Sequence, residues 1–183
     1  MSGMSRLRDA LGQRILVLDG AMGTMLQAAG LSAGDFGGAQ YEGCNEHLNL
    51  TRPDVVRGVH AAYFDAGADI VSTNTFGCAP YVLGEYGLAE RAYEITLAGA
   101  RLAREVAGTR FVVGSMGPGT RTITVTRNVT FDEVLSAYEV QARALIAGGV
   151  DALLLETAQD TLNVKAAAIG VRQAMRAAGV ALP

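Results

Sequence analysis

The sequence contains no tryptophan, and only two histidines and two cysteines occur among its 183 residues. Two cysteines are too few for the disulfide framework of a small secreted domain, and residues 1–11 lack the apolar segment of a secretory signal. No apolar run approaches the roughly eighteen residues of a membrane span. The net charge is −3 and basic residues are scattered singly, so no surface suited to nucleic acid is indicated. These absences predict a cytoplasmic protein with small-molecule partners.

One pattern occurs twice in the chain and indicates the fold class. Residues 67–75 and 149–157 align without a gap, and each follows a stretch with an apolar helical stripe. Both indicate a helix, a glycine stop, a strand buried on both faces and a polar tip, which is typical of βαβ units in a parallel sheet. The two tips place Asn74 and Glu156 at equivalent positions.

The same helix and strand pattern extends along the chain. Apolar runs predict strands in residues 14–18, 67–75, 111–115 and 149–157, with helices as the connections. Helical connections require parallel strands joined by right-handed crossovers. The helix starts are predicted from capping residues, which are Thr51 with Asp54, Thr130 with Glu133, and Asp160.

Two architectures fit these four βα units: an open doubly wound sheet and a barrel. An open nucleotide-binding sheet typically carries G-x-G-x-x-G, but Gly20-Ala21-Met22-Gly23 lacks that spacing. We therefore predict an α/β fold of the TIM (βα)₈ barrel family. Eight units need about 250 residues, so residues 1–183 are expected to form only the first four units, a partial barrel. Residues 180–183 resemble the lead-in to a fifth strand.

Polar residues follow each predicted strand. In a parallel sheet, Asp19, Asn74, residues 115–119 and Glu156 would share one rim. Two carboxylates there could act as acid and base, hold a metal, or bind an ammonium group while backbone N–H groups bind a carboxylate. Asp19 also fits a simple turn and Asn74 a capping residue, whereas Glu156 ends a run of three leucines and needs a partner.

A glycine-punctuated loop, residues 19–24, enters a helix near Met25. Glycine lets backbone N–H groups approach a ligand, and a helix start adds partial positive charge. Metal binding has weaker support. Cys44 and His47 have a metal-like spacing, but a single pair is not a site, and Cys78 fits a small buried apolar residue.

Residues 15–27, Ile-Leu-Val-Leu-Asp-Gly-Ala-Met-Gly-Thr-Met-Leu-Gln, resemble the opening of the homocysteine-binding domains of cobalamin-dependent methionine synthases, in the homocysteine S-methyltransferase family. The order and spacing of further matches along nearly the entire chain carry the resemblance. These matches are residues 43–46, Leu48, Pro53, residues 66–70, residues 73–76, Gly117-Pro118, Glu156-Thr157, residues 160–163 and residues 165–167.

The resemblance implies a (βα)₈ barrel that binds homocysteine at its C-terminal rim, with the substrate sulfur on a zinc ion held by three cysteines. It implies that Asp19 and Glu156 face the amino group, and that backbone N–H groups of residues 20–24 face the carboxylate. The expected substrate-binding residues are Asp19, Gly20, Ala21, Gly23, Thr24, Asn74 and Glu156.

The resemblance also implies that the three zinc ligands lie beyond Pro183, because neither Cys44 nor Cys78 matches their positions. We therefore expect no metal ligand and no catalytic residue in this chain, and neither zinc nor cobalamin bound to it alone. The complete enzyme would use zinc and methylcobalamin, and its cobalamin and folate domains would be partners of this one.

Two alternatives to the cobalamin-dependent enzyme stay open. One is a homocysteine methyltransferase that uses betaine or S-methylmethionine as its methyl donor. The other is a non-catalytic partial barrel that binds an amino acid. Gln27 and residues 160–163 favour the cobalamin enzyme over the first alternative.

Overall fold

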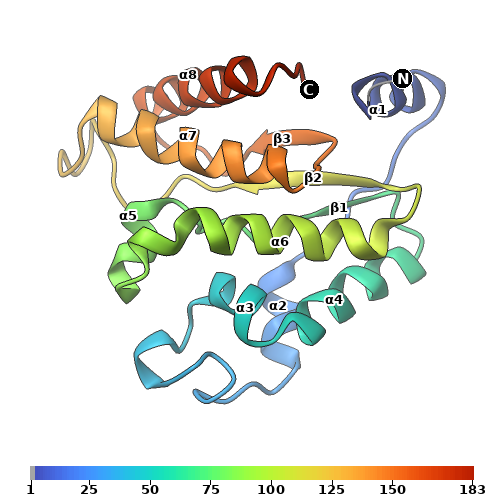
Figure 1. Cartoon of the computed structure of the whole chain (residues 1–183), viewed down its shortest axis with the longest axis horizontal. Helices are drawn as coiled ribbons and strands as arrows, with labels where there is room; N and C mark the ends of the chain where they lie inside the picture. Colours follow the sequence, from blue (N-terminus) through green and yellow to red (C-terminus); the bar gives the residue numbers. More distant parts are fainter. Residues whose placement is uncertain (1–2) are drawn as a thin grey trace.

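The computed structural model describes residues 3–183, with side chains from Arg6 onward. Within that range, three parallel strands form one sheet in the order β1 (Ile70–Ser72), β2 (Phe111–Met116) and β3 (Ala152–Leu155). All three point the same way, so their carboxyl ends lie at one edge of the sheet (Figure 1). The parallel arrangement predicted from the helical connections is confirmed.

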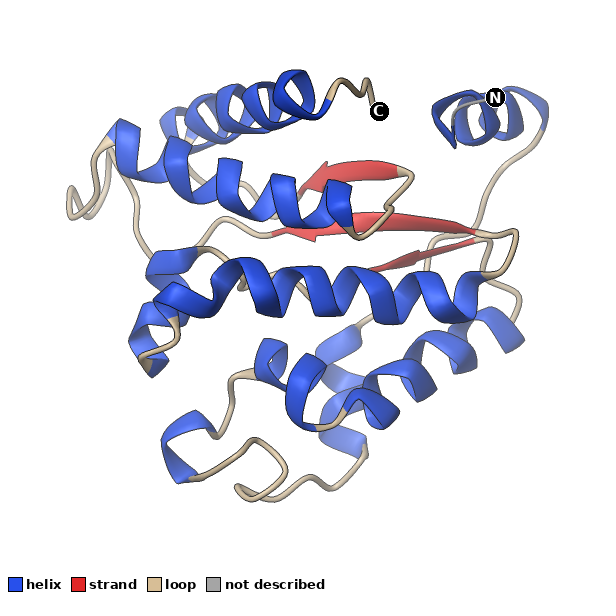
Figure 2. Cartoon of the chain, viewed as in Figure 1, coloured by secondary structure: helices blue, strands red, loops and turns tan. Residues whose placement is uncertain are grey.

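Helices surround this small sheet, as Figure 2 shows. Helix α6 packs against α4 on one side and α7 on the other, and α7 packs along α8. The helices are α1 (Gly3–Gln13), α2 (Met22–Ala28), α3 (Leu48–Thr51), α4 (Pro53–Asp65), α5 (Pro80–Leu83), α6 (Ala92–Ala107), α7 (Phe131–Ala147) and α8 (Thr161–Ala178). Short 3₁₀ turns are η1 (Ala39–Tyr41), η2 (Asn45–His47), η3 (Gly84–Tyr86) and η4 (Ala89–Arg91). No helix in the described range is long and apolar enough to cross a membrane.

The helix starts follow local sequence rules at two of the three predicted positions. Thr130 and Glu133 form a reciprocal capping box at α7, and Asp160 accepts hydrogen bonds from the first turn of α8. The predicted cap at Thr51 is wrong. Helix α4 begins at Pro53, because proline is preorganised for the first helical position, and the Thr51 hydroxyl instead bonds to the His47 carbonyl.

Each face of the sheet packs against a different layer. Val71, Val112 and Met116 belong to the main core, which the sheet forms with α4, α6, α7 and α8. Ile70, Phe111 and Val113 point to the opposite face, where they pack with Leu7 of α1. No helix was predicted from the sequence for residues 3–13. Helix α1 lies at the end of the sheet opposite to the carboxyl ends of the strands (Figure 1).

The first predicted strand, residues 14–18, is reduced to a single parallel bridge between Leu18 and Ile70. Its apolar side chains are not buried on both faces as expected, since Ile15 is 88% and Val17 55% exposed. β3 at the other edge is only half-buried. The physical reason is that an edge segment has a neighbour on one side only, so packing covers it incompletely.

Close packing between α7 and α8 occurs at Gly170. A Cβ atom there would lie 2.4 Å from the Leu135 carbonyl oxygen, a backbone atom that cannot move aside cheaply. We therefore expect Gly170→Ala to lower the free energy of unfolding by about 2 kcal/mol. Gly58, inside α4, has no neighbour within 4 Å of such an atom. Gly58→Ala should raise the same free energy by roughly 0.5–1 kcal/mol.

Urea unfolding followed by circular dichroism measures both effects, and it suits a chain without tryptophan. Both variants add the same methyl group inside a helix, so intrinsic helix propensity acts equally on them. Equal changes in the two variants would mean that α7 and α8 do not approach as closely as described.

Candidate functional site

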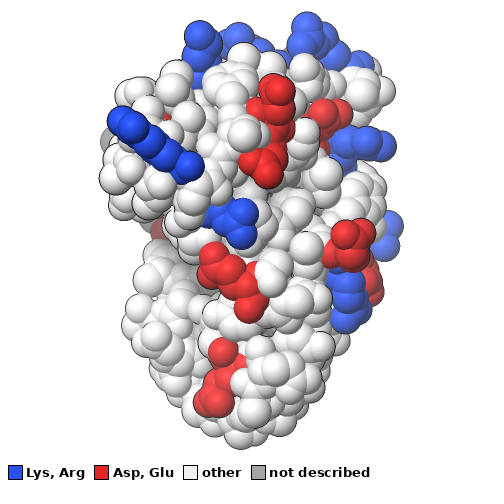
Figure 3. Space-filling view, turned by 90° about the vertical axis from the view of Figure 1, so that its left-hand side faces the viewer, with Lys and Arg blue, Asp and Glu red and all other residues white. Residues whose placement is uncertain are grey.

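The carboxyl ends of β1, β2 and β3 border a cavity of about 290 Å³, here called the rim cavity. Figure 3 views the molecule from the side toward which the strands point in Figure 1. Acidic side chains lie scattered across that face, with basic ones between and around them. The residues that line the rim cavity are Gly20, Ala21, Met22, Gly23, Asn45, Glu46, Ser72, Thr73, Asn74, Phe76, Ser115 and Glu156.

Asp19 lies beside the rim cavity and is held by β1. Its two carboxylate oxygens accept hydrogen bonds from the backbone N–H and the hydroxyl of Ser72, both at 2.9 Å. Burial raises the pKa of Asp19, the Ser72 bonds oppose that rise, and the charge of Glu156 adds to it. The two carboxylates are therefore close enough to repel each other, and a cation between them would relieve this repulsion.

Glu156 follows β3 and is fixed by the neighbouring strand. Its carboxylate accepts a hydrogen bond from the Ser115 hydroxyl at 2.6 Å, and its backbone N–H donates to the Met116 carbonyl at 3.2 Å. Ser115 is itself held, because its N–H donates to the Thr73 hydroxyl at 3.0 Å. Connected hydrogen bonds of this kind restrict the Glu156 carboxylate to one place at the rim.

Asn74 joins the end of β1 to the segment before α3. Its side-chain nitrogen donates to the Asn45 carbonyl at 2.8 Å and to the Asn49 side-chain oxygen at 3.0 Å. Asn74 is 4% exposed, and both of its amide hydrogens are used in these bonds. Only its side-chain oxygen is left to meet a ligand, and that oxygen accepts hydrogen bonds.

The loop after Asp19 lines the rim cavity with residues 20–23. Helix α2 begins at Met22, earlier than the position near Met25 that the sequence indicated. The first N–H groups of a helix have no partner within the helix and are free to bind a ligand. The loop is packed closely, since a Cβ atom at Gly20 would lie 3.0 Å from the Tyr63 hydroxyl. Thr24 is exposed and is not among the residues that line the cavity.

Residues 16–181 match the sequence model of the family described as homocysteine S-methyltransferase. The chain belongs to this family. The methionine synthases of Mycobacterium tuberculosis and Mycobacterium leprae are 48% and 47% identical to it over 184 aligned residues. These alignments cover 97% of the chain but only 15% of each relative, so the chain spans about 15% of the length of the curated relatives it matches.

Solved structures show the same fold for this homocysteine S-methyltransferase family chain. The homocysteine methyltransferase MmuM of Escherichia coli, in its metallated form, superimposes with a TM-score of 0.74 at 24% identity. Its oxidized form gives a TM-score of 0.75 at 25% identity. The superposition covers 96% of this chain and 64% or 63% of the two MmuM chains. The fold is therefore α/β with a parallel sheet, similar to that of a homocysteine methyltransferase.

The structure adds a third acidic residue to the rim, which was not predicted from the sequence. Glu46 lines the rim cavity and accepts a hydrogen bond from the Gly77 N–H at 2.7 Å. Burial raises the pKa of its carboxyl group. Ser72 was likewise not predicted as a site residue, whereas Ser115 belongs to residues 115–119, which were predicted to lie at the rim. Glu46 lies in the short 3₁₀ turn η2, which has no helix or strand periodicity in the sequence, so its only signal was the matching run of residues 43–46.

The two cysteines of this chain do not fit a zinc site. Burial raises the pKa of the Cys44 thiol to about 11 and that of Cys78 well above its usual value. Metals bind the thiolate, which such burial disfavours. Within residues 3–183, no group of three or more histidine, cysteine, aspartate or glutamate side chains is arranged to hold a metal ion.

Proposed function

We propose that this chain binds homocysteine in the rim cavity and forms part of a methionine synthase that methylates the homocysteine sulfur. The observation that carries this proposal is that the carboxylates of Asp19 and Glu156 lie close enough to repel each other. They lie next to the loop of residues 20–23, which lines the cavity. We further propose that residues 1–183 are the N-terminal half of a (βα)₈ barrel. Two observations support this. The chain superimposes on 64% of the MmuM chain, and apolar side chains at the edge of the sheet, such as Ile15 and Val17, are exposed.

An amino acid suits this arrangement because its two charges have separate partners. Asp19 and Glu156 would bind the ammonium group, each through a charge-assisted hydrogen bond. The backbone N–H groups of Gly20, Ala21 and Gly23, which line the cavity, would bind the carboxylate, and the Asn74 side-chain oxygen is a further acceptor for the ammonium. Ser72 and Ser115 hold the two acidic side chains in place before the ligand arrives. This preorganisation lowers the entropy lost on binding.

Methylation forms the S–CH₃ bond of methionine and breaks the bond between the methyl group and its donor, while the thiol proton is lost. A zinc ion supplies thiolate at neutral pH by lowering the thiol pKa. The described residues do not provide its ligands, so we assign zinc binding to cysteines beyond Pro183. What this chain does is hold the amino acid end of homocysteine and leave the sulfur free for chemistry elsewhere.

From the resemblance to cobalamin-dependent methionine synthases we infer methylcobalamin as the donor, cobalamin and folate domains as partners and a cytoplasmic location. The relatives named methionine synthase are long enough to hold such domains, because the chain covers only 15% of their length. The likeness to MmuM supports a second candidate, a homocysteine methyltransferase that uses another donor such as S-methylmethionine or betaine. Methionine formation by the complete gene product, with each donor supplied in turn, distinguishes the two. Absence of homocysteine binding by calorimetry would contradict both.

Zinc content tests the assignment of the metal ligands. We expect purified residues 1–183 to contain well under one zinc per chain, because the buried thiols of Cys44 and Cys78 are poor ligands. Elemental analysis after dialysis against zinc measures this, with the complete gene product as the positive control. One tightly bound zinc per chain in the short form would overturn the assignment.

A further inference from the structure

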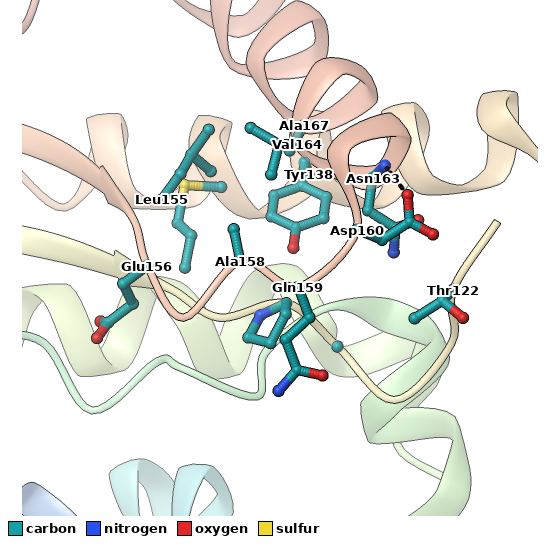
Figure 4. A pocket seen from close by; sticks show the side chains of 13 residues that line it. Thr122, Tyr138, Leu155, Glu156, Ala158, Gln159, Asp160, Asn163, Val164 and Ala167 are labelled. Carbon is teal, nitrogen blue, oxygen red and sulfur yellow. Dashed lines mark hydrogen bonds between the residues drawn. The ribbon is translucent and has the colours of Figure 1, made fainter. Parts of the chain in front are cut away.

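A second, smaller cavity lies behind Glu156 (Figure 4). Its volume is about 30 Å³, close to the space of one water molecule. Glu156 lines both this cavity and the rim cavity, and in Figure 4 its carboxylate points away from Tyr138 and Asp160. Pro118, Gly119 and Thr122 of the loop after β2 form one wall, and Asp160 and Asn163 from the start of α8 form another. The surroundings of Glu156 therefore depend on how this loop is attached to α8.

Asp160 attaches the loop to α8 through a single carboxylate. One oxygen accepts the backbone N–H of Leu162 at 2.8 Å and that of Asn163 at 3.3 Å, which caps the helix. The other oxygen accepts the backbone N–H and the hydroxyl of Thr124, at 2.8 and 2.7 Å. An ordinary N-cap needs only the first set of bonds. The second set holds the segment of residues 121–124, here called the strap.

Asn163 makes a second attachment between the same two elements. Its side-chain oxygen accepts the Ile123 N–H at 3.0 Å, and its side-chain nitrogen donates to the Arg121 carbonyl at 2.8 Å. Asp160 and Asn163 are each only 4% exposed. Removing one partner of such buried bonds leaves polar groups unsatisfied, so the strap and the first turn of α8 behave as one unit.

Glu156 is connected to this unit by a short exposed link, residues 157–159. Thr157 in the link has a φ of 56°, a left-handed conformation that is unfavourable for a β-branched residue. Such a conformation persists only where the surrounding structure holds both ends of the segment. The first end is held by the bond from Glu156 N–H to Met116, and the second end is Asp160.

We propose that Asp160 is a positioning residue for Glu156, which acts by joining the strap to α8 and thereby holding the far end of the link. Asp160 does not contact the substrate. The inference rests on the proposed function, because its readout is the affinity for homocysteine. It assigns to Asp160 a role beyond the capping of a helix.

The variant Asp160→Ser separates the two roles of this side chain. Serine is a good N-cap, so α8 keeps its cap, but one hydroxyl cannot also hold Thr124. We expect the homocysteine Kd of the complete gene product, measured by calorimetry, to rise roughly tenfold, as for loss of a hydrogen bond to a charged group. The matched control is Thr130→Ala, which removes the N-cap of α7. This control should lower the midpoint of thermal unfolding. Its homocysteine Kd should stay within about twofold of the wild-type value, well below the tenfold rise expected for Asp160→Ser.

A double variant tests whether Asp160 acts through Glu156. If it does, Asp160→Ser should weaken binding no further in a Glu156→Ala background. An unchanged Kd in Asp160→Ser, or an equal loss in both backgrounds, would overturn the inference while the wild-type protein still binds homocysteine. Failure of the wild-type protein to bind homocysteine would instead overturn the proposed function.

Discussion

We expect Glu156→Ala and Asp19→Ala each to weaken homocysteine binding by roughly 10- to 150-fold. This loss corresponds to about 1.5–3 kcal/mol, the contribution of one charge-assisted hydrogen bond. The reason is that each variant removes one of the two carboxylates proposed to bind the ammonium group. The KM for homocysteine in the complete gene product, or the Kd from calorimetry, measures the loss. Zinc content should stay close to that of the wild-type protein, because neither side chain is assigned to the metal.

The control for these two variants is Asp65→Ala. Asp65 is exposed at the end of α4, which precedes β1, so it lies away from the carboxyl ends of the strands. This variant removes the same unit of charge and should leave the affinity unchanged. Loss of zinc with retained affinity in Glu156→Ala or Asp19→Ala would show that these side chains serve the metal and not the amino group.

The affinity should also depend on pH through Asp19. Burial and the charge of Glu156 raise the pKa of Asp19, so its carboxylate takes up a proton at a higher pH than an exposed aspartate. Protonation removes the charge that would bind the ammonium group. We therefore expect the affinity to fall as the pH decreases through this raised pKa, and Asp19→Asn to lose that part of the dependence.

The second large effect concerns the stability of the fold at mildly acidic pH. His60, in α4, is fully buried, and neither of its ring nitrogens has a hydrogen-bond partner. Burial lowers the pKa of His60 to about 4. The pKa of His60 is near 6.5 in the unfolded chain and about 4 in the folded protein. At a pH between these two values, His60 is protonated in the unfolded state but not in the folded state. The free energy of unfolding should therefore fall as the pH drops through this window, by about 3 kcal/mol in total.

His60→Leu tests this directly, because leucine has a comparable size and does not titrate. Urea unfolding at pH 7 and at pH 4.5 should show a much smaller loss of stability in the variant than in the wild-type protein. Asp35 and Asp69 do not obscure the result, since their partners hold the pKa of each at about 2 and they affect stability only at lower pH. The same pH dependence in both proteins would mean that His60 is not the group responsible.

Local rules account for much of what could be predicted. The Thr130 capping box depends on residues three apart, and the cap at Asp160 depends on its own first turn, so both were visible in the sequence. The parallel order of the strands followed from their helical connections. Thr51 shows the limit of such rules, because Pro53 moved the helix start.

In the candidate site, too, local sequence patterns predicted some features, and contacts between distant residues decided others. Glu156 was predicted to lie at the rim and to have a partner because a carboxylate after a run of leucines needs one, and it does line the rim cavity. Its actual partner, the Ser115 hydroxyl, is 41 residues away in the chain, and no local pattern indicated that contact. Glu46, in the 3₁₀ turn η2, is held at the rim by a hydrogen bond from the Gly77 N–H, and it was missed for the same reason.

The sequence by itself determined the parallel α/β class, the caps of α7 and α8 and the side chains that follow each strand, because periodicity and capping depend on neighbours within a few residues. Only the tertiary structure decided how completely residues 14–18 join the sheet, where α1 packs and which groups hold Asp19, Glu156 and the strap. These depend on contacts between segments tens of residues apart, whose energies are set by burial and hydrogen-bond geometry in three dimensions.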